Sequence, residues 1–372
     1  MKFGFSVINF KRIDWLLLSA VTLLICFGLS AIYSVALGRG AGELMNFQKQ
    51  LTWVGVGIFF LFILYNFDYH YWRLIGWFGY AASLVLLILV LTPLGSTVRG
   101  TSGWFNLGLF SFQPVELTKI FLIMVLADIY SRHGRVIYGF RQLAMVGGVV
   151  LIPLALVMLQ PDLGSGMILF FTWFISLILV TKNKWQIILI AGAVIVVFLA
   201  GWFFLFKDYQ RARIMTFIDP SLDPLGRGYN VQQSLIAVGG GRLMGKGLGF
   251  GSQSQLKFIP ESQTDFIFAV IAEEMGLIGV TFILSFYALI FFRLYRIATR
   301  APDDFGMFLA LFIMLIFFVQ MFINIGMCMG ISPVTGISLP FVSYGGSFLI
   351  TAILLIGIAL NINKSGSLAR RH

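Results

Sequence analysis

The sequence predicts an all-α integral membrane protein, a polytopic bundle of about ten transmembrane helices with one large loop between the seventh and eighth spans. Of the 372 residues, 59% are hydrophobic and 11% are charged, whereas a soluble domain carries roughly 25% charged residues. Apolar runs of about 20 residues, the length that crosses a bilayer, recur along the whole chain. They leave no room for a soluble domain of ordinary size, so residues 1–372 are expected to form a single membrane domain.

The spans follow from these apolar runs. The first run is too long for the core of a signal peptide and is followed by many others, so we expect it to be retained. Cys26 and Cys328 lie inside apolar segments, which indicates small buried side chains rather than disulfides or metal ligands. In chain order the predicted spans cover residues 14–35, 49–67, 72–92, 114–131, 143–160, 164–181, 186–206, 265–292, 305–330 and 343–362.

Basic residues predict the orientation of the bundle, because they are enriched on the cytoplasmic side of a membrane protein. Alternate ends of the spans collect them, and we expect that side, with both termini, to be cytoplasmic. The net charge of +11 then reflects topology and gives no reason to expect a nucleic-acid partner. The residues on this side are Lys2, Lys11, Arg12, Arg73, Arg132, Arg135, Arg141, Lys182, Lys184, Arg293, Arg296, Arg300, Lys364, Arg370 and Arg371.

Two connections on the opposite, extracytoplasmic side are long: 93–113 and 207–264. The second is far longer than a median connection of about 4–6 residues, which marks it as a candidate functional segment. Its cations outnumber its acids, against the trend for an external loop, so we expect it to bind something anionic. Contact with membrane lipid headgroups is the alternative. The cations are Lys207, Arg211, Arg213, Arg227, Arg242, Lys246 and Lys257, and the acids are Asp208, Asp219, Asp223 and Glu261.

Asp265 lies where this polar loop enters the eighth predicted span. A carboxylate at the edge of the hydrocarbon layer can meet a lipid-linked substrate at its polar head. Partial burial there favours the raised pKa of a useful general base. The alternative is that Asp265 caps the following helix, because Thr-Asp is a good N-terminal signal.

Other ionisable residues are expected at membrane depth, where they normally face a polar cavity or each other. Glu116 and Lys119 lie three residues apart on one helix face, and we favour a functional cavity with Lys119 facing a carboxylate or a phosphate. Asp162, Glu273 and Glu274 fit a cavity or an ion pair between helices equally well.

The segment from Gly240 to Lys246 has the glycine and lysine spacing of a phosphate-binding P-loop. Gly247 replaces the Ser or Thr that would hold magnesium, and no strand–helix unit surrounds it, so ATP binding is excluded. Flexible amides with Arg242 and Lys246 can still bind a diphosphate, or the segment is simply a glycine-rich turn. The sequence contains no Asp-x-Asp element, so a metal-bound nucleotide-sugar donor is not expected.

At several of these residues the sequence resembles the SEDS family of membrane proteins, which polymerise peptidoglycan from lipid II. Gln253-Ser-Gln-Leu is more similar to RodA, the elongation enzyme, than to FtsW, its division counterpart. The resemblance covers most of the chain and is carried by Trp104-Phe-Asn-Leu-Gly108, Phe112-Gln-Pro-Val-Glu-Leu-Thr-Lys119, Gln160-Pro-Asp-Leu-Gly164, Tyr209-Gln-Arg-Ala-Arg213, Gly228-Tyr-Asn-Val-Gln-Gln-Ser234, Pro260-Glu-Ser-Gln-Thr-Asp-Phe266 and Leu339-Pro-Phe-Val-Ser-Tyr-Gly-Gly-Ser347.

Three positions depart from the family pattern. Gly103 stands where a basic residue usually precedes the tryptophan, and Arg99 is a candidate substitute. Gln263 replaces a common histidine two residues before Asp265, which argues against a carboxylate–histidine pair. Arg242 replaces a common glycine. Asp265 itself matches the family's essential aspartate.

The resemblance implies a peptidoglycan glycosyltransferase that inverts the sugar linkage on the outer face of the bacterial cytoplasmic (inner) membrane during cell elongation. It would release undecaprenyl diphosphate, with a class B penicillin-binding protein, a transpeptidase, as partner. A divalent cation such as Mg²⁺ or Mn²⁺ at the diphosphate is compatible with this chemistry, although the sequence shows no dedicated ligands. Asp265 is the expected base, and the expected substrate-binding residues are Trp104, Glu116, Lys119, Asp162, Arg213, Arg242, Lys246 and Glu261.

Two other functions are compatible with the sequence. A lipid II flippase or another transporter of lipid-linked substrates would also use buried carboxylates and interrupted spans, but it needs no base at the outer interface. A purely structural scaffold for the division or elongation machinery would leave the cationic loop unexplained.

Overall fold

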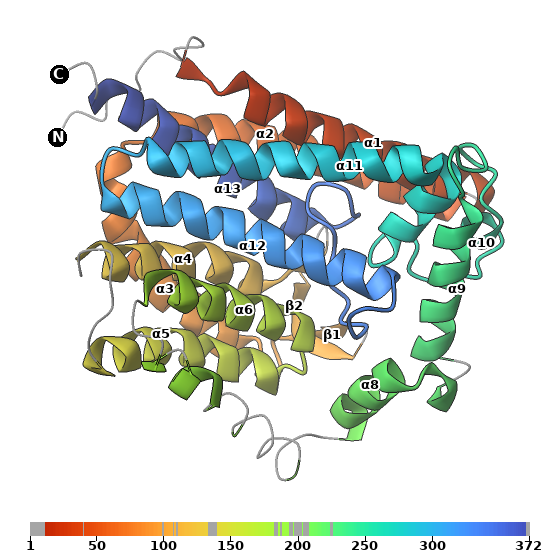
Figure 1. Cartoon of the computed structure of the whole chain (residues 1–372), viewed down its shortest axis with the longest axis horizontal. Coiled ribbons are helices and arrows are strands. Elements are labelled where there is room, and N and C mark those ends of the chain that lie inside the picture. Colours follow the sequence, from red (N-terminus) through yellow and green to blue (C-terminus); the bar gives the residue numbers. More distant parts are fainter. Residues whose placement is uncertain are drawn as a thin grey trace.

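The structure is a computed structural model in which the helices run side by side along the long axis of the molecule (Figure 1). It describes residues 12–39, 41–98, 100–106, 108, 111–132, 140–181, 185–186, 188–192, 196, 203, 208–223 and 226–369. Eight described helices are long and apolar enough to cross a membrane: α1 (Trp15–Arg39), α2 (Ala41–Asn66), α3 (Trp72–Leu89), α5 (Phe140–Leu159), α6 (Leu163–Val180), α11 (Ile267–Thr299), α12 (Asp304–Cys328) and α13 (Gly346–Ala369). A predominantly helical membrane protein is therefore confirmed.

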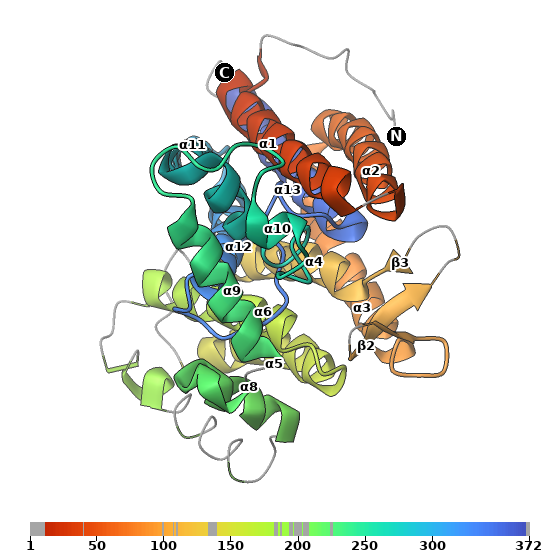
Figure 2. The same ribbon diagram turned by 90° about the vertical axis from the view of Figure 1, so that its right-hand side faces the viewer.

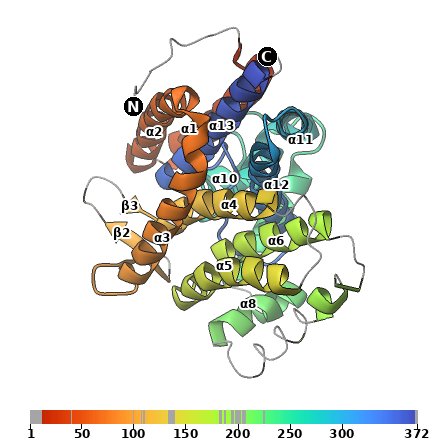
Figure 3. The ribbon, with the colours of Figure 1, turned by 90° about the vertical axis from the view of Figure 1, so that its left-hand side faces the viewer.

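The helix α4 (Pro114–Arg132) fills the predicted fourth span although it is too charged for the length-and-hydropathy criterion. It packs against α3, α5, α12 and α13, and Figure 3 shows it in the middle of the bundle. Its neighbours, rather than lipid, therefore surround Glu116, Lys119 and Asp128, which are all buried, as expected for charges at membrane depth. The predicted span 186–206 falls mostly outside the described residues.

The described ends of the chain lie at one end of the bundle, where α1 begins and α13 ends (Figure 1). Ion pairs join helix ends there: Arg293 contacts Asp14 at 2.5 Å and Arg73 contacts Asp303 at 2.8 Å. The predicted loop 207–264 lies at the opposite end. Figure 2 looks onto that end, which holds α8 (Asp208–Ile218), α9 (Arg227–Gly240) and α10 (Ser252–Gln255).

A small antiparallel sheet forms in the predicted loop 93–113, a departure from the all-α expectation. It consists of β1 (Ser96–Val98), β2 (Thr101–Asn106) and β3 (Ser111–Phe112) in the order β1-β2-β3. The register places Ser96 opposite Trp104 and Phe105 opposite Phe112. The strands are two to six residues long, too short for an alternating pattern to be read from the sequence.

Helix α11 is interrupted at Gly276, whose φ of 64° and ψ of −163° are not helical. A break leaves carbonyls before it and amides after it without partners inside the helix. The glycine-rich loop supplies these partners: the amides of Lys246 and Gly247 donate to the carbonyls of Glu273 and Glu274 at 3.0 and 2.9 Å. The amide of Leu277 donates in turn to the carbonyl of Arg242 at 2.9 Å. The loop therefore repairs the backbone hydrogen bonding of a broken span.

Candidate functional site

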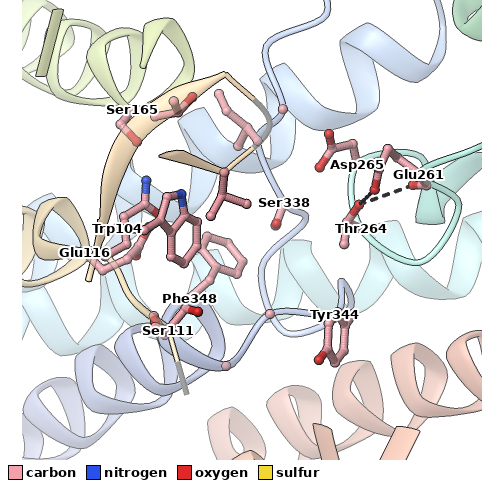
Figure 4. A pocket seen from close by; sticks show the side chains of 18 of the residues that line it. Trp104, Ser111, Glu116, Ser165, Glu261, Thr264, Asp265, Ser338, Tyr344 and Phe348 are labelled. Carbon is pink, nitrogen blue, oxygen red and sulfur yellow. Dashed lines mark hydrogen bonds between the residues drawn. The ribbon is translucent and has the colours of Figure 1, made fainter. Parts of the chain in front are cut away.

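A pocket of about 950 Å³ is lined by α2, the small sheet, α4, the start of α6, α9, the segment before α11, and residues 334–338 and 344–348. These elements meet at the end of the bundle opposite the chain ends (Figure 1). In Figure 4, Asp265, Thr264 and Glu261 lie on one side, and Trp104, Glu116 and Phe348 lie on the other. The structure thus brings together these predicted site residues: Trp104, Glu116, Lys119, Asp162, Glu261 and Asp265.

Asp265 is not the N-cap residue of α11, contrary to the capping interpretation. The N-cap residue is Phe266, whose side chain makes no capping hydrogen bond. Asp265 precedes the helix in a turn and is half-buried. A Cβ added to Gly336 would lie 3.5 Å from its Oδ2 atom, so the carboxylate faces the loop that contains Gly336.

Hydrogen bonds to three successive carbonyls hold the backbone at Asp265 in place. Tyr344 donates its amide to the carbonyl of Gln263 at 2.9 Å, and Ser343 donates its hydroxyl to that of Thr264 at 2.6 Å. The Nδ2 atom of Asn324 donates to the carbonyl of Asp265 at 2.9 Å. The Asp265 carboxylate is therefore carried on a segment that α12 and residues 343–344 hold in place.

Asn324 also positions the loop opposite the carboxylate. It is fully buried on α12, and its Nδ2 atom donates a second hydrogen bond, of 2.7 Å, to the carbonyl of Ile337. Because Ile337 follows Gly336, one amide group sets the spacing between the Asp265 segment and the loop that faces it. The family motifs did not single out Asn324.

Glu116 and Lys119 form a buried ion pair at the wall of the pocket, with Nζ and Oε1 at 2.7 Å and side chains 5% and 1% exposed. The Lys119 ammonium also lies 5.4 Å from the centre of the Phe348 ring. The Oε2 atom of Glu116 is buried and has no hydrogen-bond partner among the described residues. A buried acceptor without a partner is unfavourable, so this oxygen is a point at which a substrate donor could bind.

Asp162 caps α6 and lines the pocket at the same time. Its carboxylate accepts from the amide and the hydroxyl of Ser165 at 3.0 and 2.7 Å, and from Gln113 Nε2 at 3.0 Å. On the opposite side of the pocket from Asp162, Thr264 donates a hydrogen bond to a carboxylate oxygen of its neighbour Glu261 at 3.0 Å. Burial raises the pKa of the Tyr344 phenol, and the Glu43 carboxylate adds to this effect, so Tyr344 stays protonated as a donor at the pocket wall.

Arg242 and Lys246 do not line the pocket that holds Asp265. They line a separate hollow formed by residues 240–246. Lys246 forms an ion pair with Glu273 at 2.7 Å, and its amide donates to the carbonyl of Glu273 in the broken helix. Of the two alternatives for the glycine-rich segment, these contacts support the structural turn.

Glu273 and Glu274 bond residues of the segment 246–255 and of α1 to α11, and they do not line the pocket. Glu273 accepts from Lys246 and from the amides of Gln253 and Ser254 at 3.0 and 3.2 Å. Glu274 accepts from Ser34 at 2.7 Å. Of the two readings for these carboxylates, interhelical bonding is the one that their contacts support.

The structure describes Arg213, Arg99 and Gln263 to different extents. The structure describes the backbone of Arg213 on α8 but not its side chain, and Arg99 lies outside the described residues. Gln263 is buried and accepts from Asn46 of α2 at 3.0 Å, so it ties the Asp265 segment to another helix. Within the described residues, no three Asp, Glu, His or Cys side chains lie close enough to hold a metal ion. A divalent cation at the diphosphate stays a prediction.

One face of α2 was missed by the sequence analysis. Lys49, Thr52 and Trp53 line the pocket, and their spacing of three and four residues places them on one helix face. Residues 344–347 belong to the family motif Leu339–Ser347, but the sequence did not predict that they line the pocket. The helical spacing of Lys49 and Trp53 was the signal available for α2.

Comparisons with known proteins agree with the fold. The family model FTSW_RODA_SPOVE, described as a cell cycle protein, matches residues 12–368. The chain is 36% identical to "Peptidoglycan glycosyltransferase MrdB" of Escherichia coli K12, over 93% of each chain. It is 37% identical to "Stage V sporulation protein E" of Bacillus subtilis 168, over 94% of this chain and 97% of that one.

Solved structures show the same architecture. A chain in "Structural coordination of polymerization and crosslinking by a peptidoglycan synthase complex" matches with a TM-score of 0.80 and 29% identity, over 95% of this chain and 98% of the other. Rod shape determining protein RodA of Thermus thermophilus matches with a TM-score of 0.71 and 26% identity, with the same coverage.

Proposed function

This membrane protein belongs to the FtsW/RodA/SpoVE family and is a peptidoglycan glycosyltransferase, and from that premise we propose that it polymerises lipid II with Asp265 as the general base. One observation carries the proposal: Asp265 lines the large pocket on a segment whose carbonyls are held in place. A carboxylate held at the wall of such a pocket is suited to take a proton from a substrate hydroxyl.

The reaction requires one base and a leaving group that already carries charge. The Asp265 carboxylate takes the proton of a sugar hydroxyl on the incoming lipid II, and the hydroxyl oxygen attacks the anomeric carbon of the growing strand. The bond between that carbon and the diphosphate oxygen breaks, its electron pair leaves on undecaprenyl diphosphate, and the configuration inverts. A glycosidase needs a second carboxyl group to protonate its leaving alkoxide, but a diphosphate needs charge balance instead.

The pocket offers partners for both substrate parts. Among the predicted substrate-binding cations whose side chains the structure describes, Lys119 is the one that lines the pocket, on the wall beside Phe348. Trp104 presents an aromatic ring next to Glu116 (Figure 4), a surface suited to a sugar face. The unpartnered Oε2 of Glu116 would accept from a sugar hydroxyl.

Orientation follows from the basic helix ends. We propose that the end of the bundle carrying Arg73, Arg132 and Arg300 faces the bacterial cytoplasm, so that the pocket opens on the outer face of the inner membrane. Lipid-linked precursors would then meet Asp265 at the depth of their diphosphate groups. We also propose a role in cell elongation. MrdB and stage V sporulation protein E match this chain at 36% and 37% identity, so the identities alone do not assign the role.

A class B penicillin-binding protein is the proposed partner. The peptidoglycan synthase complex whose chain shares this fold is described as coordinating polymerisation with crosslinking. A transpeptidase beside the pocket would crosslink the strand as it forms.

Purified protein incubated with labelled lipid II, with and without a class B penicillin-binding protein, tests the proposed function. We expect glycan strands that grow with time and are digested by a muramidase. Translocation of lipid II across vesicles without any strand formation would instead identify a flippase and overturn the proposal.

A further inference from the structure

The pocket has a charge imbalance that a diphosphate substrate must overcome. Carboxylates line it on several sides: Glu116, Asp162, Glu261 and Asp265. Among the described residues, Lys49 and Lys119 are the Lys and Arg side chains in the lining. Lys119 is already paired with Glu116 at 2.7 Å. A diphosphate that entered this pocket would be repelled by like charges unless another cation met it.

Among the described lining residues, Lys49 is the side chain that can meet the diphosphate. It is exposed, and within the described part of the chain it takes part in no ion pair. A lysine ammonium on a long flexible stem can reach a phosphate without rearrangement of the backbone.

The position of Lys49 is fixed by its neighbour. Gln50 is buried and makes two hydrogen bonds with the turn that borders the pocket: it donates to the carbonyl of Ser343 at 3.0 Å and accepts from the amide of Gly345 at 3.1 Å. Helix α13, which follows that turn, also approaches α2 closely, since a Cβ on Gly346 would lie 2.6 Å from Trp53 Nε1. The face of α2 that carries Lys49, Thr52 and Trp53 is thereby held against the pocket.

We propose that Lys49 binds the phosphate groups of the lipid-linked substrate at the pocket and balances the charge that the diphosphate carries as it leaves. The inference rests on the proposed function, because it takes the anionic group from the lipid-linked donor. It assigns the missing cation to α2 rather than to the glycine-rich loop, whose Lys246 is paired elsewhere.

Binding measured in an Asp265→Asn background tests this inference without depending on the identity of the base. Undecaprenyl diphosphate is the probe, and undecaprenol, which lacks phosphate, is the comparison ligand. We expect Lys49→Gln to weaken undecaprenyl diphosphate binding about tenfold, the lower end of the range for a hydrogen bond to a charged group. Lys49→Arg should retain most of the affinity, and undecaprenol binding should not change.

Lys257→Gln is the matched control, because Lys257 is also an exposed lysine but does not line the pocket. We expect it to bind undecaprenyl diphosphate as the parent protein does. Phosphatidylglycerol vesicles separate the two sources of phosphate. Equal losses for phosphatidylglycerol and undecaprenyl diphosphate in Lys49→Gln would assign Lys49 to lipid headgroups and overturn the proposal. Unchanged binding of undecaprenyl diphosphate in Lys49→Gln would also overturn it.

Discussion

At the scale of single residues, variants of the Glu116–Lys119 ion pair distinguish a role in stability from a role in function. Replacing Lys119 by Met leaves a buried carboxylate without its cation, which is expected to lower the free energy of unfolding by about 3 kcal/mol. The double variant Glu116→Gln/Lys119→Met removes both charges at similar volume and should recover most of that loss. Melting temperatures in detergent measure the stability, and strand formation from lipid II measures the function.

We expect the double variant to stay inactive, because the pocket then lacks the ammonium and the carboxylate that face the substrate. A double variant that recovers both stability and polymerisation would show that the pair only holds helices together.

Asn324 gives a second residue-scale prediction. Asn324→Ala removes the amide donor to the carbonyls of Asp265 and Ile337, and Asp265 keeps only the weak bond from the Cys328 thiol at 3.6 Å. A buried acceptor that loses its donor costs about 1–3 kcal/mol. The rate of polymerisation should fall while KM changes little, because the base moves and the substrate contacts remain. Ser332→Ala, which loses one hydrogen bond to Ile323 in the same region, is the control. Equal activity in the two variants would exclude a positioning role for Asn324.

The residues that position Asp265 show where sequence reasoning ends at this scale. Asp265 could be predicted, because an acid at the entry to an apolar span is unusual and matches a known motif. Asn324 and Ser343 bond to its segment from 59 and 79 residues away. Such contacts depend on how α12 and the following loop pack, and no local pattern in a single sequence reports that packing.

At the scale of elements, the glycine-rich loop and the break in α11 form one unit. Gly245 has a φ of 78°, and a Cβ there would lie 2.2 Å from the carbonyl oxygen of Glu274. Gly249 has a φ of 82° with nothing within 4 Å of an added Cβ. Gly249→Ala should therefore lower stability by about 1–2 kcal/mol, the cost of a left-handed residue. Gly245→Ala should lower it clearly more, because the loop must also separate from α11.

Thermal unfolding of the two alanine variants checks this prediction. Equal melting temperatures would mean that the loop does not need its close approach to α11. The sequence predicted a turn or a diphosphate cradle here with equal weight. It could not decide, because the partners of the loop amides are carbonyls exposed by a helix break at Gly276, and glycine alone does not predict a break.

At the scale of the whole molecule, most of the bundle could be predicted from hydropathy, since long apolar runs must be helical in a bilayer. The small sheet could not. Hydropathy also says nothing about neighbours: Lys246 was placed near Asp265 because both belong to the same end of the bundle. The fold instead pairs Lys246 with Glu273.

The topology itself is testable with single cysteines. Arg300→Cys, at the turn between α11 and α12, should react with a membrane-impermeant maleimide only from the cytoplasmic side. Leu248→Cys, whose parent residue is 52% exposed, should react from outside in intact cells. The exposed Cys26 is replaced by serine in both, while Cys328 is buried and stays. Labelling of Arg300→Cys in intact cells would invert the proposed orientation.

The central claim, that this chain polymerises lipid II through Asp265, is tested most directly by the strand-forming rate of Asp265→Asn. Asparagine keeps the shape of the side chain but cannot accept the proton, and loss of a general base typically lowers a rate about 10²- to 10⁴-fold. Because Asp265 is not the N-cap residue of α11 and asparagine keeps its shape, the melting temperature and lipid II binding should stay unchanged. We therefore predict a folded protein that binds lipid II and makes no detectable glycan. An Asp265→Asn protein that still makes long strands would contradict the account.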